Sequence, residues 1–208
     1  MSSFNADTAK KVLAKLRTIM EENKDYLIEL DGVMGDGDLG ITMAKCFSAA
    51  DEQLSSSDET DVGKLLMKAG MTMANAAPST MGTLVGTGFM RGGKAVGGKE
   101  DLEGADMAAF FSAFVQGLID RGKAQPGEKT IIDALKPAAE AMESADGGVQ
   151  EVLKAGHKAA EEGLEATKEM VAQHGRAAYY QEQSKGRQDP GATVGVMIVR
   201  GFMEGAEE

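Results

Sequence analysis

The chain has 208 residues, the size of one ordinary domain, and its 33 acidic side chains against 22 basic ones give a formal net charge of −11. Nucleic-acid backbones and anionic membrane surfaces both attract clustered positive charge, so we expect neither as a partner. Cys46 is the single cysteine, which excludes an intramolecular disulfide and favours a cytoplasmic location. We expect no signal peptide and no membrane span, because no stretch approaches the roughly 18 apolar residues that a span requires.

Apolar residues recur every three or four positions along nearly the whole chain, which is the pattern of amphipathic α-helices. In chain order this pattern predicts helices over residues 7–30, 41–54, 61–76, 82–96, 104–119, 130–142, 148–173 and 191–203. No stretch alternates clearly enough to predict a strand, and no linker divides the chain. We therefore predict one all-α domain spanning residues 1–208, built as a helical bundle with short connections.

The predicted helix 82–96 contains an unusual number of glycines. They are Gly82, Gly86, Gly88, Gly92 and Gly93. A glycine inside a helix costs up to ~1 kcal/mol relative to alanine. The composition therefore predicts that another part of the protein approaches this helix closely.

The loop over residues 30–40 carries the most distinctive chemistry. Asp31, Asp36 and Asp38 fall within eight residues and are interleaved with glycines. Three carboxylates this close repel one another unless they are solvated separately or share a cation, and oxygen ligands suit Mg²⁺. Aspartate and glycine are also the best turn formers, so spacing alone leaves a metal site and a simple turn both open.

Two further loops have groups suited to phosphate. Residues 77–82 place small hydroxyls and free amides at a predicted helix start, where either an anion or an ordinary side-chain cap can satisfy the amides. Residues 185–191 lead into the last predicted helix, and Arg176 and Arg187 precede that helix. Each guanidinium could donate two hydrogen bonds to a phosphate, or each side chain could simply be solvated. The loop over residues 121–130 is a weaker candidate.

The remaining reactive side chains are assigned structural roles. His157 lies in the charged predicted helix 148–173 and His174 lies directly at its end, so we expect both to be solvated rather than catalytic. Cys46 is expected to be a small core residue. The sequence gives no Ser/His/Asp or Cys/His set, and we therefore name no catalytic nucleophile.

Taken in order, these segments resemble the nucleotide-binding L subunit of bacterial dihydroxyacetone kinases. That family has an Asp followed by Gly-Asp-Gly-Asp-His-Gly-x-Asn-Met, and this chain has Asp31 followed by Gly35-Asp-Gly-Asp-Leu-Gly-Ile-Thr-Met43. The other matching motifs are Thr80-Met-Gly-Thr-Leu-Val-Gly-Thr87, Gly127-Glu-Lys-Thr-Ile-Ile-Asp-Ala-Leu135, Gly175-Arg-Ala-Ala-Tyr179 and Gly186-Arg-Gln-Asp-Pro-Gly-Ala192. The resemblance covers essentially the whole chain.

The resemblance implies an eight-helix antiparallel barrel that binds ADP or ATP at one end. It implies that Asp31, Asp36 and Asp38 hold two Mg²⁺ ions that bridge the phosphates. The nucleotide contacts it implies are Leu39, Gly40, Ile41, Thr42, Thr80, Met81, Gly122, Ile131, Arg176, Asp189, Pro190 and Gly191. Of these, Gly122, Ile131 and residues 189–191 would border the adenosine. Thr80, Met81 and residues 40–42 would contact the phosphates, and Arg176 would lie near the nucleotide.

The resemblance also implies an activity shared between subunits. This chain would act as the phosphoryl-transfer subunit of a kinase, while a separate K-type subunit binds dihydroxyacetone or a related ketose. The phosphoryl donor would be either free ATP or a phosphotransferase-system protein, and a homo-oligomer is left open. Leu39 and Thr42 replace the family's His and Asn, and Arg187 replaces a further His. Two alternatives therefore stay open: a nucleotide-sensing module without turnover, and a helical interaction protein whose acidic loop is only a turn.

Overall fold

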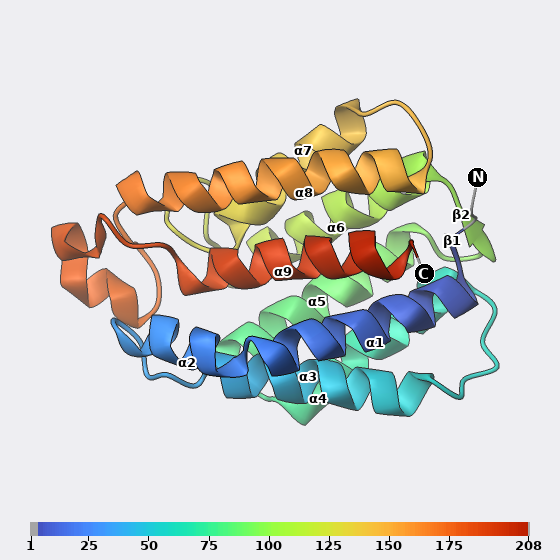
Figure 1. The fold of residues 1–208 in the computed structure, drawn as a ribbon, viewed down its shortest axis with the longest axis horizontal. Helices are drawn as coiled ribbons and strands as arrows, with labels where there is room; N and C mark the ends of the chain where they lie inside the picture. The colour runs from blue at the N-terminus through green and yellow to red at the C-terminus, as the bar shows by residue number, and fades with distance from the viewer. Residues whose placement is uncertain (1–3, 208) are drawn as a thin grey trace.

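Nine α-helices dominate the computed structural model, which describes residues 4–207 (Figure 1). They are α1 (Ala6–Glu22), α2 (Lys24–Gly32), α3 (Leu39–Leu54), α4 (Val62–Ala76), α5 (Thr80–Ala95), α6 (Gly104–Gly122), α7 (Ile132–Ser144), α8 (Val149–Ala166) and α9 (Pro190–Gly205). Two 3₁₀ segments follow α8, η1 (Thr167–Glu169) and η2 (Arg176–Ser184). The short strands β1 (Phe4–Asn5) and β2 (Asp101–Leu102) pair antiparallel.

The predicted all-α fold is confirmed, although the described residues form nine α-helices instead of the eight predicted, and two predicted helices differ substantially. The predicted helix 7–30 is two helices that meet at Asn23, where the backbone leaves the helical region (φ −100°, ψ 11°) and the side-chain amide donates back to the Ile19 carbonyl at 2.8 Å. The predicted helix 148–173 ends at Ala166, and the residues after it form η1, η2 and loops. The two-residue strands are too short to show a period of two, so the sequence did not predict them.

The long helices pack as a closed series. α1 packs on α3, and α4, α5, α6, α7, α8 and α9 follow in chain order until α9 returns to α1. The short α2 packs mainly on α3. No described helix is long and apolar enough to cross a membrane.

Phenylalanine rings fill the centre of this series. Phe89 of α5 packs edge-on against Phe114 of α6 with ring centroids 5.4 Å apart, and Phe110 lies 5.3 Å from Phe202 of α9. A Cβ at Gly88 would collide with the Phe114 ring, and one at Gly92 would collide with Phe110. The glycines of α5 thus let aromatic rings of α6 lie directly against its backbone, which confirms the close approach predicted from composition.

The arrangement of the helices brings the four chemically distinctive loops to one end of the molecule. They connect α2 to α3, α4 to α5, α6 to α7 and α8 to α9, and alternate connections between antiparallel neighbours emerge on the same side. Figure 1 shows this end at the left, and β1 and β2 at the right. We call these the site end and the strand end.

Candidate nucleotide and metal site

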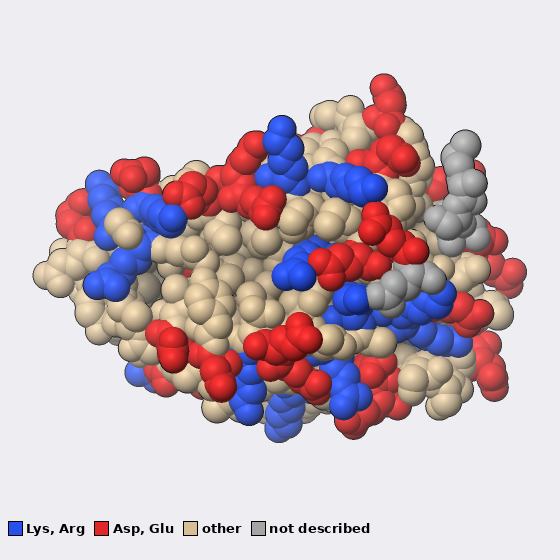
Figure 2. Space-filling view, in the orientation of Figure 1, with Lys and Arg blue, Asp and Glu red and all other residues tan. Residues whose placement is uncertain are grey.

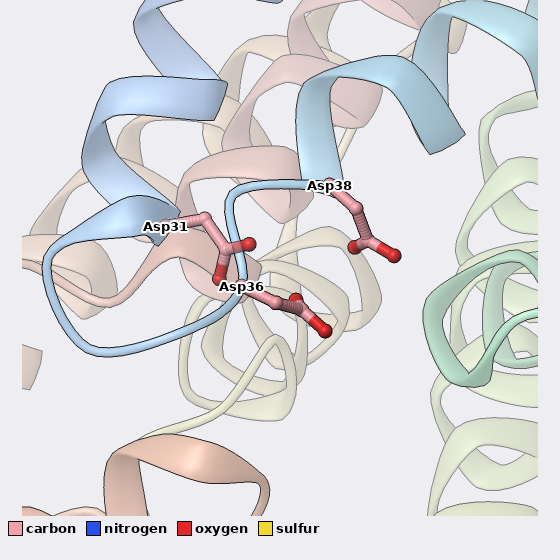
Figure 3. Close-up of side chains that lie close together, drawn as sticks. All are labelled: Asp31, Asp36 and Asp38. Carbon is pink, nitrogen blue, oxygen red and sulfur yellow. The ribbon is translucent and has the colours of Figure 1, made fainter.

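The acidic loop forms one wall of the site. Asp31 lies in the last turn of α2, Asp36 in the loop, and Asp38 at the first position before α3. One carboxylate oxygen from each residue lies within 4.8 Å of the others, and Figure 3 shows the three side chains turned toward a common space. The three aspartates picked out by their spacing thus lie close enough to share a cation.

Two glycines make this convergence sterically feasible. The N–H of Gly37, which has a φ of +71°, donates to Asp31 Oδ2 at 2.9 Å. The N–H of Gly35 donates to the Asp31 carbonyl at 2.6 Å, and a Cβ at Gly35 would collide with the Asp31 carboxylate. A left-handed φ and this close approach both favour glycine, so the glycines position the carboxylates rather than merely loosening the loop.

The carboxylates concentrate negative charge. Burial raises the pKa of Asp38, and the neighbouring carboxylates of Asp36 and Asp31 raise it further. Arg176 opposes this shift, and its Nη2 lies 2.9 Å from Asp36 Oδ2. One guanidinium therefore faces three carboxylates. This all-oxygen, negatively charged donor set fits a hard divalent cation such as Mg²⁺, and the residues present thus fit the metal that the resemblance implies.

A cavity of about 840 Å³ opens beside the acidic loop. Its walls come from the acidic loop, the start of α5, the end of α6, the loop before α7, the residues around η2 and the start of α9. Apolar side chains such as Leu84 and Leu118 line it together with polar groups. An apolar cavity with carboxylates on one wall suits a ligand that joins a flat ring to phosphates.

The helix N-termini around this cavity are capped differently. Ser79 Oγ accepts the N–H of Gly82 at the start of α5, at 3.1 Å, and Asp189 Oδ2 accepts the N–H of Ala192 at the start of α9, at 2.7 Å. Asp38, at the start of α3, makes no such side-chain bond. The Asp38 carboxylate is therefore directed to the acidic cluster rather than used as a cap.

Most of the predicted nucleotide-binding residues line this cavity. They are Leu39, Thr80, Met81, Gly122, Ile131, Arg176, Asp189, Pro190 and Gly191. Gly40, Ile41 and Thr42 of α3 are not among its lining residues: a Cβ at Gly40 would collide with the Lys24 carbonyl, Ile41 is 52% exposed, and Thr42 is buried. Leu39 is only 5% exposed and packs in the hydrophobic core.

Sequence reasoning missed two groups at the cavity. The prediction that His174 is solvated at the end of a helix is wrong: it lies between η1 and η2, lines the cavity, and its Nε2 is 2.6 Å from Glu128 Oε2. Lys129 is 5% exposed and also lines the cavity. The only signal for Lys129 was its place in the motif 127–135, which gives no hint of burial.

Of the other reactive side chains, Cys46 behaves as expected and His157 only in part. Cys46 is fully buried, which confirms a core residue, and burial raises the pKa of its thiol to about 11. His157 does lie on the charged α8, but the prediction that it is solvated is wrong, because its side chain is only 17% exposed and its Nε2 is buried. Asp189 differs from the exposed aspartates, because burial raises its pKa to about 7 despite the N–H bond from Ala192 and the charge of Lys129.

Comparison with known proteins decides the family. The model of the family described as "DAK2 domain" matches residues 33–204. This chain belongs to the DAK2 domain family. The ADP-binding subunit DhaL of the PEP-dependent dihydroxyacetone kinase of Escherichia coli is 33% identical over 199 residues, covering 94% of this chain and 95% of that protein.

Solved structures of a DAK2 relative share the fold. The native dihydroxyacetone kinase of C. freundii superposes with a TM-score of 0.75 and 24% identity, over 98% of this chain. Its complex with AMP-PNP and Mg²⁺ gives a TM-score of 0.71 and 22% identity, over 97% of this chain. This DAK2 chain spans about a third of the C. freundii chain, 35% and 33% in the two structures.

Proposed function

We propose that this chain is the nucleotide-binding, phosphoryl-transfer subunit of a dihydroxyacetone-type kinase. A separate K-type subunit would bind the ketose. The observation that carries the proposal is the convergence of Asp31, Asp36 and Asp38 on one wall of a cavity large enough for a nucleotide. Membership of the DAK2 family and the similarity to an ADP-binding kinase subunit support it.

The roles of the residues follow from their positions. The acidic cluster would hold two Mg²⁺ ions, which neutralise the phosphates and the charge that develops during transfer. Thr80 and Met81, at the start of α5, would contact the phosphates with amides and a hydroxyl. Arg176 would add a cationic donor on the opposite wall.

The base and ribose would lie deeper in the cavity. Gly122, Ile131 and the residues 189–191 border its apolar part together with Leu84 and Leu118. Leu39 packs in the core and has no donor, so contacts from the start of α3 would come from main-chain amides such as those of Gly40 and Ile41. The ketose and its general base would both belong to the partner, since phosphoryl transfer asks mainly for positioning and electrostatics on the nucleotide side.

We further infer that bound ADP is rephosphorylated by a phosphotransferase-system protein, and that the chain works in the cytoplasm. The PEP-dependent, ADP-binding character of the E. coli relative supports this choice over free ATP. The replacement of a family His by Leu39 would weaken the retention of nucleotide, which instead favours free ATP as the consumed donor. Leu39 and Thr42 together also favour the alternative of a nucleotide-sensing module without turnover.

Reconstitution tests the proposal. Calorimetry is expected to show Mg²⁺-dependent binding of ADP to the purified chain. Dihydroxyacetone should then be phosphorylated only when a K-type subunit and a donor are added, either ATP or a phosphorylated phosphotransferase protein. Nucleotide binding without any transfer in the complete mixture would favour the sensing module. Robust ketose phosphorylation by the chain alone would contradict the division of labour, and absence of Mg²⁺-dependent binding would overturn the whole assignment.

A further inference from the structure

Residues 167–187, between α8 and α9, form a distinct stretch of wall at the site end, which we call the cover segment. It contains η1, η2 and the loops around them, and His174, Arg176 and Arg187 from it line the cavity. Figure 2 shows basic and acidic side chains together at the left, where Figure 1 places this segment. Of the basic ones, Arg176 and Arg187 line the cavity, and Arg176 reaches Asp36 of the acidic loop.

A single buried lysine holds both ends of the cover segment. The ammonium of Lys129 donates to the carbonyls of Thr167 at 2.7 Å, Ser184 at 2.8 Å and Arg187 at 2.6 Å, with the Met170 carbonyl at 3.4 Å. An ammonium has three N–H donors, so these main-chain carbonyls account for all of them. Thr167 and Met170 precede η2, whereas Ser184 is its last residue and Arg187 follows it, so one side chain joins the two ends of the cover segment.

The backbone conformation at Lys129 is strained, so the surrounding contacts must offset a conformational free-energy cost. Lys129 has a φ of +61°, the left-handed region that non-glycine residues seldom adopt. Burial lowers the pKa of its ammonium, while the carboxylates of Asp189 and Glu169 oppose the shift. A buried cation on strained backbone persists when surrounding contacts hold it, and here those contacts are the four carbonyls.

The middle of the cover segment has fewer attachments. His174 pairs with Glu128, the Gln173 N–H donates to the Glu128 carbonyl at 3.2 Å, and Arg176 pairs with Asp36. Tyr179 is 89% exposed. Gly175 and Gly186 have φ values of +64° and +75° with open space around them, so the chain can pivot at both glycines.

We propose that Lys129 is a positioning residue that keeps the cover segment closed over the nucleotide and thereby sets how long the nucleotide stays bound. Lys129 acts through Arg176 and the other cover residues and need not touch the nucleotide itself. This inference rests on the proposed function, since it assumes that the cavity binds Mg-ADP. It assigns a task to a motif residue that the metal and phosphate contacts leave without one.

The first test measures the cover segment without nucleotide. In Lys129→Met the thioether replaces the ammonium at similar length, so the four carbonyls lose their donor. Hydrogen exchange at the amides of Ala172 and Gly186, which bond to Ser184 Oγ and the Lys168 carbonyl, is expected to accelerate at least tenfold. The matched control is Lys136→Met, which removes an exposed lysine paired with Glu140 on α7 and should leave both amides unchanged.

The second test measures nucleotide release by stopped-flow displacement of a fluorescent ADP analogue in Mg²⁺. Loss of charge-assisted hydrogen bonds predicts release about ten- to a hundredfold faster in Lys129→Met, with the association rate within about twofold of wild type. A purely structural role would lower the unfolding temperature without separating these two rates. Lys129→Gln, which keeps two N–H donors, is expected to fall between wild type and Lys129→Met, and it replaces the Met variant if that variant does not unfold cooperatively.

The outcomes separate the two proposals. If wild type binds Mg-ADP and a folded Lys129 variant exchanges or releases at the wild-type rate, the role of Lys129 is overturned and the proposed function stands. If the wild-type chain does not bind Mg-ADP, the proposed function is wrong and the role of Lys129 in retention is overturned with it. Faster exchange together with faster release, absent in Lys136→Met, supports the assignment.

Discussion

Asp61 and Asp38 occupy the same position relative to a helix at opposite ends of the molecule, and they differ in almost every other respect. Asp61 precedes α4 at the strand end, where its two oxygens accept the N–H groups of Lys64 at 3.0 Å and Gly98 at 2.9 Å. Burial alone would raise the pKa of Asp61, but these amides outweigh it and the pKa is lowered. Asp38 precedes α3 at the site end, makes no cap bond, and has a raised pKa.

The contrast separates an aspartate that stabilises the fold from one that is kept for a ligand. At the strand end the carboxylate charge is neutralised by main-chain donors, so it strengthens the helix start. At the site end three carboxylates face one another with one guanidinium between them, which leaves charge for a cation to neutralise. Asp189 is intermediate, because it caps α9 yet is buried beside the cavity with its pKa raised to about 7.

The largest effect is expected when the acidic cluster is broken. Asp36→Ala or Asp38→Ala should abolish detectable Mg²⁺-dependent ADP binding while the helical content stays native, because the remaining carboxylates cannot hold the cation. Calorimetry and circular dichroism measure the two quantities. Asp58→Ala, an exposed aspartate in the loop between α3 and α4, is the control and should bind as wild type does. Wild-type affinity in either cluster variant would contradict the metal assignment.

The next effect concerns pH. The pKa of Asp189 is about 7 in the folded protein against an ordinary value of 3.8, so the unfolded chain loses this proton first. Protonated Asp189 therefore makes its full contribution to the free energy of unfolding below about pH 4. As the pH rises toward 7 this contribution is lost, and the free energy of unfolding falls by on the order of 4 kcal/mol. Asp189→Asn keeps a capping oxygen without the charge, so its unfolding free energy should fall less over this range. Urea titrations from pH 4 to 8 measure the difference.

Asp61 is expected to change the pH dependence of unfolding in the opposite direction to Asp189. Its lowered pKa means that its carboxylate stabilises the fold above about pH 4, and this contribution disappears as the pH falls below that value. If Asp61→Asn and Asp189→Asn changed the pH profile in the same direction, the distinction between the two aspartates would be wrong.

A smaller loss is expected when the strand-end cap is removed at neutral pH. Asp61→Ala leaves the N–H groups of Lys64 and Gly98 without their acceptor and should cost about 1–2 kcal/mol of unfolding free energy. Mg-ADP affinity should not change, because Asp61 lies at the other end of the fold. Denaturant unfolding and calorimetry on the same variant give both numbers, and a weakened affinity would link the two ends.

The smallest expected effect is a gain in the unfolding temperature of the metal-free protein. Without Mg²⁺, Asp38→Asn removes one of three repelling charges and should raise the unfolding temperature by roughly 1–2 °C. Asp36→Asn should gain less, because Asp36 also loses its ion pair with Arg176. Scanning calorimetry in chelator measures both. Equal or lower temperatures in Asp38→Asn would mean that the carboxylates do not repel one another in the metal-free protein.

Much of this protein was determined by local sequence. The three- and four-residue apolar period fixes the helices, because burial of one helix face is a local pattern. Asp31, Asp36 and Asp38 are close in sequence, so their grouping follows from chain connectivity and from glycines that permit the tight loop. The glycines of the predicted helix 82–96 correctly predicted close contact, though not that phenylalanine rings of α6 make it.

One boundary depends on a local side chain that helical periodicity does not register, because the Asn23 amide donates back to the Ile19 carbonyl where α1 ends. Tertiary structure alone decided the rest. His174 reaches Glu128, and Lys129 reaches the carbonyls of Thr167, Ser184 and Arg187, across separations of 38 to 58 residues. Whether a histidine or lysine is solvated or buried depends on which loops meet at the same end of the bundle. That meeting is set by the packing order of the helices, so the sequence could not show that His174 and Lys129 have partners far away along the chain.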